Sequence, residues 1–160
     1  EIDYETAIQL AKIPNVVALK DSTANQDQMT KTLECVVGDV RVFAPFISKR
    51  GHALLTDIGG DGNIDGGPTA ASLGVAFYQN VRRSNHHAAL QIAEEYGNLM
   101  TRLIRPDWGG VFGTPQAQYK ACMNLMGQPG GYPRLPLLPV DEADTLKRLG
   151  DVLASSGLIT

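Results

Sequence analysis

The chain has 160 residues, within the usual span of one domain, and 43% of them are hydrophobic, which is enough for a sizeable core. Its formal net charge of −3 argues against a nucleic-acid-binding protein, because such proteins normally carry a basic face. No apolar run approaches the roughly 20 residues that span a bilayer, so we expect neither a membrane segment nor a membrane partner.

The first half of the chain alternates between helical and extended patterns. Apolar residues at helical spacing, the capping residue Asp3, and the stops Pro14 and Gly38 mark the boundaries. The predicted elements are a helix over 3–13, a strand over 15–20, a helix over 25–37, a strand over 40–44, a helix over 48–57, a strand over 61–65 and a helix over 68–82. This alternation indicates βα units around a parallel sheet, so the predicted fold class is α/β.

The second half is predicted to be helical. Its expected elements are a helix over 86–105, a helix over 114–127, a proline-rich connector over 129–139 and a helix over 141–155. Asp141 is predicted to cap the last helix. We therefore divide the chain into an α/β unit over 1–83 and a helical subdomain over 84–160. The α/β unit is either an open three-stranded layer or part of a barrel whose first strands are missing. Since the sequence opens inside a helical pattern without an initiator Met, we expect a fragment of a longer chain.

Lys20 ends the apolar run 15–20, which is bounded by Pro14 and by the polar stretch 21–25. A short run rich in Val is typical of a buried parallel strand, and the carboxyl ends of such strands carry the chemistry of barrel folds. An amine in apolar surroundings is more readily neutral, and a neutral amine attacks a ketone to form a Schiff base. The commoner alternative, from this segment alone, is a surface lysine at a strand exit.

Two patterns resemble metal sites but are incomplete. The segment 61–66 matches the first half of a calcium loop, but Ser72 occupies the position of the required glutamate and Pro68 falls inside the loop. The three histidines share no metal-binding spacing with the two cysteines, and we expect the adjacent pair His86 and His87 to be solvated. The sequence therefore predicts no metal site.

A cluster of glycines over 59–67 suggests a phosphate cradle. The dinucleotide-binding pattern G-x-G-x-x-G would need a glycine where Asp65 stands, so that motif fails. Two interpretations stay open. Either main-chain amides at the helix start near Pro68 hold a carboxylate or phosphate, or the glycines allow close packing of strand against helix.

The two cysteines, Cys35 and Cys122, lie far apart in apolar helical contexts. We expect both to be buried free thiols in a reducing compartment, which predicts a cytoplasmic location. Trp108 lies between two predicted helices, and we expect it to pack as a core anchor, with a subunit contact as the alternative.

Four segments carry a family resemblance, in the correct order and spacing. Segments 13–22 (IPNVVALKDS) and 59–64 (GGDGNI) correspond to a Schiff-base lysine strand and a last barrel strand. Segments 113–127 and 130–139 (GGYPRLPLLP) correspond to a helix and to the connector before a last helix. Together they resemble the dihydrodipicolinate synthase and N-acetylneuraminate lyase family, over essentially all 160 residues.

That family has a (β/α)₈ barrel followed by a three-helix carboxyl-terminal subdomain. The resemblance implies that this chain holds strands six to eight, with helix five at its front. Strands one to five, with the family's paired threonines and its proton-relay tyrosine, have no counterpart. Lys20 matches the Schiff-base lysine, and Ile64 matches a position whose backbone carbonyl faces the bound keto acid. Main-chain amides near Gly66 and Gly67 would aid carboxylate binding. The chain departs from the family at 43–47, where a glycine usually follows strand seven.

The resemblance implies a lyase or aldolase that forms a Schiff base with pyruvate or another 2-keto acid and makes or breaks a carbon–carbon bond. It implies neither a metal nor an organic cofactor, and a homo-oligomer, dimer or tetramer, as the full-length form. One alternative is a sugar-acid aldolase or dehydratase of the same family. Others are a non-catalytic split half-barrel that needs a partner chain, and a domain that binds an anion near Gly66 without chemistry. We expect the isolated 160 residues to be inactive or nearly so.

Overall fold

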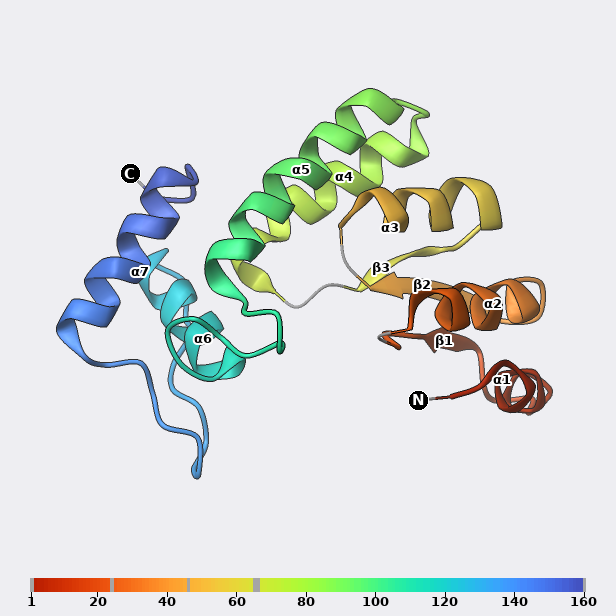
Figure 1. Cartoon of the computed structure of the whole chain (residues 1–160), viewed down its shortest axis with the longest axis horizontal. Helices are drawn as coiled ribbons and strands as arrows, with labels where there is room; N and C mark the ends of the chain where they lie inside the picture. Colours follow the sequence, from red (N-terminus) through yellow and green to blue (C-terminus); the bar gives the residue numbers. More distant parts are fainter. Residues whose placement is uncertain (1, 24, 46, 65–66, 160) are drawn as a thin grey trace. The chain divides into compact units, whose positions relative to one another are not determined.

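The structure, a computed structural model, describes residues 2–23, 25–45, 47–64 and 67–159. The chain forms two compact units (Figure 1): the first comprises Glu1–Gly66 with Leu73–Glu94, and the second comprises Gly67–Ser72 with Glu95–Thr160. Among the described residues, no helix combines the length and the apolar character that crossing a membrane requires. The domain boundary after residue 83 stays a prediction.

The first unit contains a three-stranded parallel sheet, as the alternating pattern predicts. Its strands β1 (Ala18–Lys20), β2 (Arg41–Pro45) and β3 (Gly62–Ile64) lie in the order β1-β2-β3. Lys20 pairs in register with Phe43 of β2. Because the strands are parallel, their carboxyl ends meet at one edge of the sheet and their amino ends at the other.

Helices precede, connect and follow these strands. They are α1 (Tyr4–Ala11), α2 (Gln26–Val36), α3 (Lys49–Ala53), the π-helical turn η1 (Leu54–Ile58), the 3₁₀ turn η2 (Pro68–Ala70), α4 (Ala71–Arg82) and α5 (His86–Leu103). The predicted helix over 48–57 is therefore two elements, α3 and η1. The π-helical turn η1 ends at Gly59, whose φ of 93° lies in the left-handed region that favours glycine.

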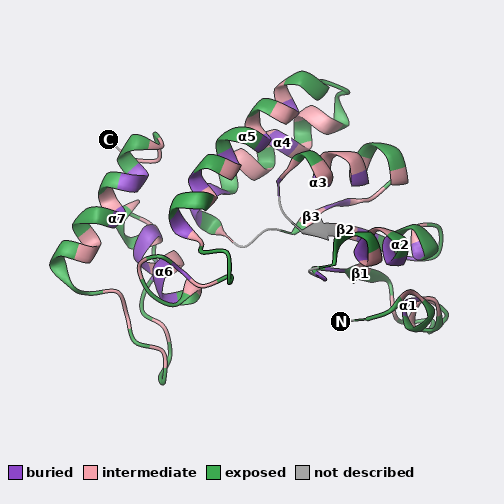
Figure 2. Cartoon of the chain, in the orientation of Figure 1, coloured by how far each residue is buried: buried purple, intermediate pink, exposed green. Residues whose placement is uncertain are grey.

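The core of the first unit lies on one face of the sheet. Leu19 and Val42, which are register neighbours in β1 and β2, pack with side chains of α1, α2 and η1. Figure 2 marks the buried positions of the chain, including those of α2, in purple. The buried members of this cluster are Ala7, Met29, Leu33, Val36, Val40, Val42 and Leu54. Its α2 members Met29, Leu33 and Val36 follow the helical spacing predicted over 25–37, and each large apolar side chain buried in the cluster contributes about 1.5–3 kcal/mol. Since successive strand residues alternate between faces, Lys20 and Phe43 lie on the opposite face.

The described elements of the second unit are helical. α6 (Pro115–Leu125) begins after the predicted cap Thr114, and α7 (Ala143–Ser155) buries Leu149, Val152 and Leu153. These helices confirm the predicted helical patterns over 114–127 and 141–155.

Gln118 is fully buried in the second unit and joins α6 to the end of α5. Its Nε2 donates to the Leu103 carbonyl at 2.9 Å, and its Oε1 accepts from the Phe112 amide at 3.0 Å. A buried amide side chain is stable only when both its donor and its acceptor are used, so these two bonds fix where α6 meets α5.

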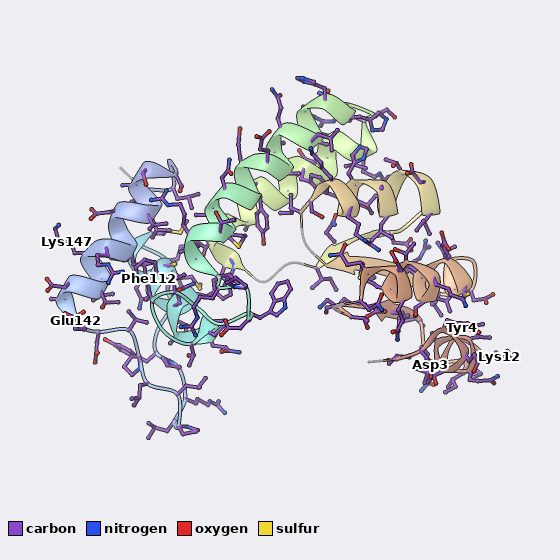
Figure 3. The ribbon with its side chains drawn as sticks, viewed as in Figure 1. Asp3, Tyr4, Lys12, Phe112, Glu142 and Lys147 are labelled. Atoms are coloured by element: carbon purple, nitrogen blue, oxygen red, sulfur yellow. The ribbon has the colours of Figure 1, made fainter. Side chains whose placement is uncertain are left out.

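The cap of α7 corrects the sequence prediction: the residue is Glu142, labelled in Figure 3, and not Asp141. The Glu142 carboxylate accepts from the Thr145 hydroxyl, from the Thr145 amide at 2.7 Å and from the Asp144 amide at 3.1 Å. These bonds hold the pKa of Glu142 below its usual range, with the Thr145 hydroxyl as the largest cause. Because the helix begins one residue later than predicted, Asp141 lies outside the capping position.

Two side chains that we expected in the core are exposed. Cys35 is one position from Val36 and two from Leu33 on α2, so the 3.6-residue repeat turns it away from the buried stripe. Trp108 is 59% exposed and has a φ of 65° in the turn after α5, where its amide donates to the Arg105 carbonyl. Cys122, by contrast, is buried as predicted, and burial raises its pKa to about 11.

Candidate functional site

Lys20 is the last residue of β1, so it lies at the carboxyl edge of the parallel sheet. It is exposed among the described residues, and its Nζ donates a hydrogen bond to the Ser22 hydroxyl. Ser22 is the last residue of the segment 13–22 that carries the family resemblance, but its contact with the amine could not be predicted from the sequence. The contact limits the directions in which the amine points, because it joins the tip of a flexible side chain to the short side chain of Ser22, two residues on.

The residues after Lys20 are held by local hydrogen bonds. Asp21 is buried, and its Oδ1 accepts from the Thr23 amide at 2.7 Å. No described residue forms a hydrogen bond to its Oδ2. Asn25 caps α2 by accepting from the amides of Asp27 and Gln28, each at 3.1 Å. Local hydrogen bonds therefore fix both the backbone just after Lys20 and the start of α2.

Arg50 of α3 joins two of the helices that follow strands of the sheet. It donates to the Gln26 carbonyl and side chain, and to the Thr30 hydroxyl at 2.6 Å. Its guanidinium is also 3.9 Å from the Asp27 carboxylate. α2 follows β1 and α3 follows β2, so these contacts hold the starts of both helices together at the carboxyl edge. Periodicity alone could not identify Arg50, because the partners lie 20 to 24 residues away.

Ile64, the second residue predicted to bind substrate, ends β3 and is 48% exposed. It pairs in register with Pro45, two residues beyond the Phe43–Gly62 pair that is level with Lys20. With strands about 4.8 Å apart, β1 and β3 are separated by about 10 Å. The structure thus places Lys20 and Ile64 at the same edge of one sheet. Gly66, the third predicted residue, lies outside the described residues.

The described glycines of the cluster make close contacts. A Cβ at Gly62 would come within 3.3 Å of two ring atoms of Phe43, and a Cβ at Gly67 within 3.1 Å of the Tyr119 ring. Gly62 of β3 thus lies close to Phe43 of β2, and Gly67 lies close to Tyr119 of α6; the choice between the two interpretations of the cluster stays a prediction. Pro68 opens only the three-residue turn η2 before α4 continues.

Asp61, in the segment that resembles a calcium loop, is occupied by protein donors. Its Oδ1 accepts from Arg41 Nη1 at 2.7 Å, and its Oδ2 accepts from the Val42 amide at 2.8 Å. These bonds, the Val42 amide foremost, hold its pKa below the usual range. In the described part of the chain, no three His, Cys, Asp or Glu residues gather as a metal site would need.

Comparisons with known proteins identify one family. The sequence model of the dihydrodipicolinate synthetase family matches residues 1–154. The 4-hydroxy-tetrahydrodipicolinate synthase 1 of Halalkalibacterium halodurans is 29% identical over 140 residues, covering 87% of this chain and 44% of that protein. The corresponding synthase of Listeria monocytogenes serotype 4b is 32% identical over 146 residues, covering 88% and 45%. The chain thus spans about half the length of the curated relatives it matches.

Solved structures show the same likeness in three dimensions. A dihydrodipicolinate synthase from Bacteroides thetaiotaomicron superposes with a TM-score of 0.74 at 17% identity, over 97% of this chain and 51% of that one. An N-acetylneuraminate lyase from Mycoplasma synoviae gives 0.71 at 16% identity, over 96% and 50%. At these identities the likeness concerns the fold, which here is mixed α/β, rich in helices, with a small parallel sheet.

Proposed function

Because this chain belongs to the dihydrodipicolinate synthetase family, we propose that it is the carboxyl-terminal part of a (β/α)₈-barrel lyase in which Lys20 forms a Schiff base with a 2-keto acid. In this proposal β1, β2 and β3 are barrel strands six to eight, and the helices after α4 form the three-helix subdomain. The observation that carries it is the position of Lys20 at the carboxyl end of a parallel strand, inside the segment that the family model matches.

The proposed chemistry begins when the neutral Lys20 amine attacks the keto carbon. The carbinolamine loses water to give an iminium, which withdraws electrons from the adjacent carbon. A proton leaves that carbon, and the resulting enamine adds to an aldehyde or imine to form the carbon–carbon bond. The reverse sequence cleaves the bond, and hydrolysis of the iminium returns the free amine. The cycle needs neither a metal nor an organic cofactor.

Ser22 acts in this proposal as a positioning residue for Lys20. Its hydroxyl accepts from Nζ, so it holds the amine in a restricted orientation before the keto acid arrives. The Ile64 carbonyl would face the bound keto acid from β3, about 10 Å away across the sheet. The amides near Gly66 and Gly67 would contribute to carboxylate binding.

The direct test is borohydride reduction in the presence of pyruvate, followed by mass spectrometry of the intact chain. We expect one reduced adduct in the unaltered protein and in Lys49→Ala, and none in Lys20→Ala. Lys49 is a matched control, because it is also exposed and begins the helix after β2, at the same edge of the sheet. An adduct that persists in Lys20→Ala would refute the assignment.

A non-catalytic half-barrel that needs a partner chain is the second candidate. It is favoured by the share of its relatives that the chain covers, about half, and by β1, which pairs only with β2 among the described residues. An unpaired strand edge promotes association. Size-exclusion chromatography with light scattering distinguishes the two: a monomer that forms the adduct favours the enzyme, and an associated chain that forms none favours the half-barrel.

Three further properties of the whole protein remain predictions: the choice between pyruvate lyase, sugar-acid aldolase and dehydratase, the homo-oligomeric full-length form, and the cytoplasmic location. The inactivity of the 160 residues alone is a fourth prediction.

A further inference from the structure

A second concave site lies in the first unit, away from Lys20. It is a hollow of about 510 Å³ between η1, the residues before β3, the end of α4 and the start of α5. The side chains that matter to the argument are Thr56, Asp61, Tyr78, Arg82, Ser84 and His86. Its volume is in the range of small-molecule sites.

The hollow is at the opposite edge of the sheet from the proposed Schiff-base centre. Gly60 and Asp61, which line it, directly precede β3, so they mark the amino edge of the parallel strands. Lys20 ends β1 at the carboxyl edge. A ligand in the hollow would therefore bind independently of the amine.

Arg82 gives the hollow an uncompensated positive charge. Among the described residues no carboxylate lies within 4 Å of its guanidinium; its neighbour is Tyr78, whose Oη is 3.4 Å from Nη1. The one carboxylate in the described lining belongs to Asp61, and its two oxygens already accept from Arg41 and from the Val42 amide. Asp61 is therefore not available to neutralise Arg82.

Contacts within the fold hold the other polar side chains of the lining. The Tyr78 hydroxyl donates to the Asp61 carbonyl at 2.6 Å, which fixes the ring beneath the guanidinium at 5.9 Å from centroid to Cζ. His86 Nδ1 is 2.9 Å from His52 Nε2, so α3 holds the His86 ring at the wall of the hollow. Ser84 also lines the hollow, as does Thr56, whose hydroxyl already donates to the His52 carbonyl at 3.1 Å and to Asp57 Oδ1 at 2.7 Å.

We infer that this hollow binds a small oxyanion, the phosphate or carboxylate group of a metabolite, with Arg82 as the principal contact. A guanidinium presents a planar fork of donors that matches two oxygens of either group, and hydroxyl and imidazole groups are common supporting donors. This inference does not depend on the proposed Schiff-base chemistry.

The test is titration of the ¹⁵N-labelled 160-residue chain with inorganic phosphate and, separately, with acetate at constant ionic strength, observed by NMR. We expect saturable shifts at amides around the hollow. Arg82→Gln should weaken the affinity at least about tenfold, because it removes a charge-assisted contact. Arg83→Gln is the matched control, since Arg83 is the exposed neighbour that does not line the hollow, and it should leave the affinity unchanged.

Tighter binding of phosphate would assign the ligand to phosphorylated metabolites, and tighter binding of acetate would assign it to carboxylic acids. Two outcomes overturn the inference: no saturable binding of either anion, or equal weakening by Arg82→Gln and Arg83→Gln, which would show only general attraction. Lys20→Ala should bind the anion as the unaltered chain does, so a failure of the Schiff-base proposal is distinguishable from a failure here.

Discussion

At the amino edge of the sheet Asp61 joins the start of β3 to β2 through hydrogen bonds from Arg41 and Val42, whereas at the carboxyl edge Lys20 ends β1 exposed. Among the described residues, the Lys20 amine has only the Ser22 hydroxyl as a hydrogen-bond partner. One small sheet thus meets two requirements, stability and an accessible nucleophile, at opposite edges. Its amino edge is tied together and contributes stability, while its carboxyl edge leaves a nucleophile accessible.

Substitution in the buried core that packs on the sheet should have the largest effect on stability. Leu33 is fully buried between α2 and the sheet, so Leu33→Ala leaves a cavity and should lower the free energy of unfolding by about 2–5 kcal/mol. Cys35→Ala, on the exposed side of the same helix, should change it by less than about 0.5 kcal/mol. Urea unfolding followed by circular dichroism measures both. Equal effects of the two substitutions would contradict the described core.

Removing the hydrogen bonds that Asp61 accepts at the amino edge should have the second-largest effect on stability. Asp61→Ala leaves the Val42 amide without its acceptor and should destabilise the unit by about 1–3 kcal/mol, while adduct formation at Lys20 persists. Asp39→Ala, an exposed carboxylate just before β2, serves as the control and should be nearly neutral. Loss of the adduct in folded Asp61→Ala would show that the two edges are not separable.

The stabilisation that the Asp61 hydrogen bonds provide should depend on pH. The pKa of Asp61 is lower in the folded state than in the unfolded state, where it is about 3.9. The stability that the Asp61 carboxylate contributes is therefore fully present above the unfolded-state pKa and is lost as the pH falls through the folded-state pKa. The stability difference between the unaltered chain and Asp61→Ala should therefore shrink below about pH 4. Urea titrations at pH 7 and pH 3 test this, and a difference that grows in acid would contradict it.

At the carboxyl edge, the smallest effect is expected from Ser22. Ser22→Ala should slow formation of the trapped adduct about fivefold, the equivalent of one ordinary hydrogen bond, without changing stability. Ser22→Thr keeps the hydroxyl and should restore the rate. A slowed rate in both variants would indicate a packing effect, and an unchanged rate in Ser22→Ala would remove its positioning role.

Local patterns predicted the elements well where the sequence offers one clear cap. For α1, Asp3 caps the helix as expected, and for α2 the apolar residue Leu33 is buried at helical spacing. The same reasoning missed the cap of α7 by one residue, because Asp141 and Glu142 are adjacent acids and only the backbone geometry selects between them. The burial of Cys35 was wrong because an apolar neighbourhood in sequence does not fix which side of a helix a residue occupies.

The candidate sites were less accessible to prediction than the fold. The end of a Val-rich run points to Lys20, but Ser22 and Arg50 act through contacts that no spacing rule contains. Arg82 and His86 come from different elements, and the His52–His86 contact spans 34 residues. Contacts between residues that are far apart in the sequence form only in the folded chain, so the spacing of residues in the sequence does not predict them.

Whether Lys20 is the Schiff-base nucleophile is tested most directly by locating the reduced pyruvate adduct by peptide mapping. The chain is treated with pyruvate and borohydride, digested, and sequenced by tandem mass spectrometry. We expect the modification on Lys20, with Lys12, Lys31 and Lys49 unmodified. Modification spread over several exposed lysines, or confined to a lysine other than Lys20, would contradict the assignment of this residue as the Schiff-base nucleophile.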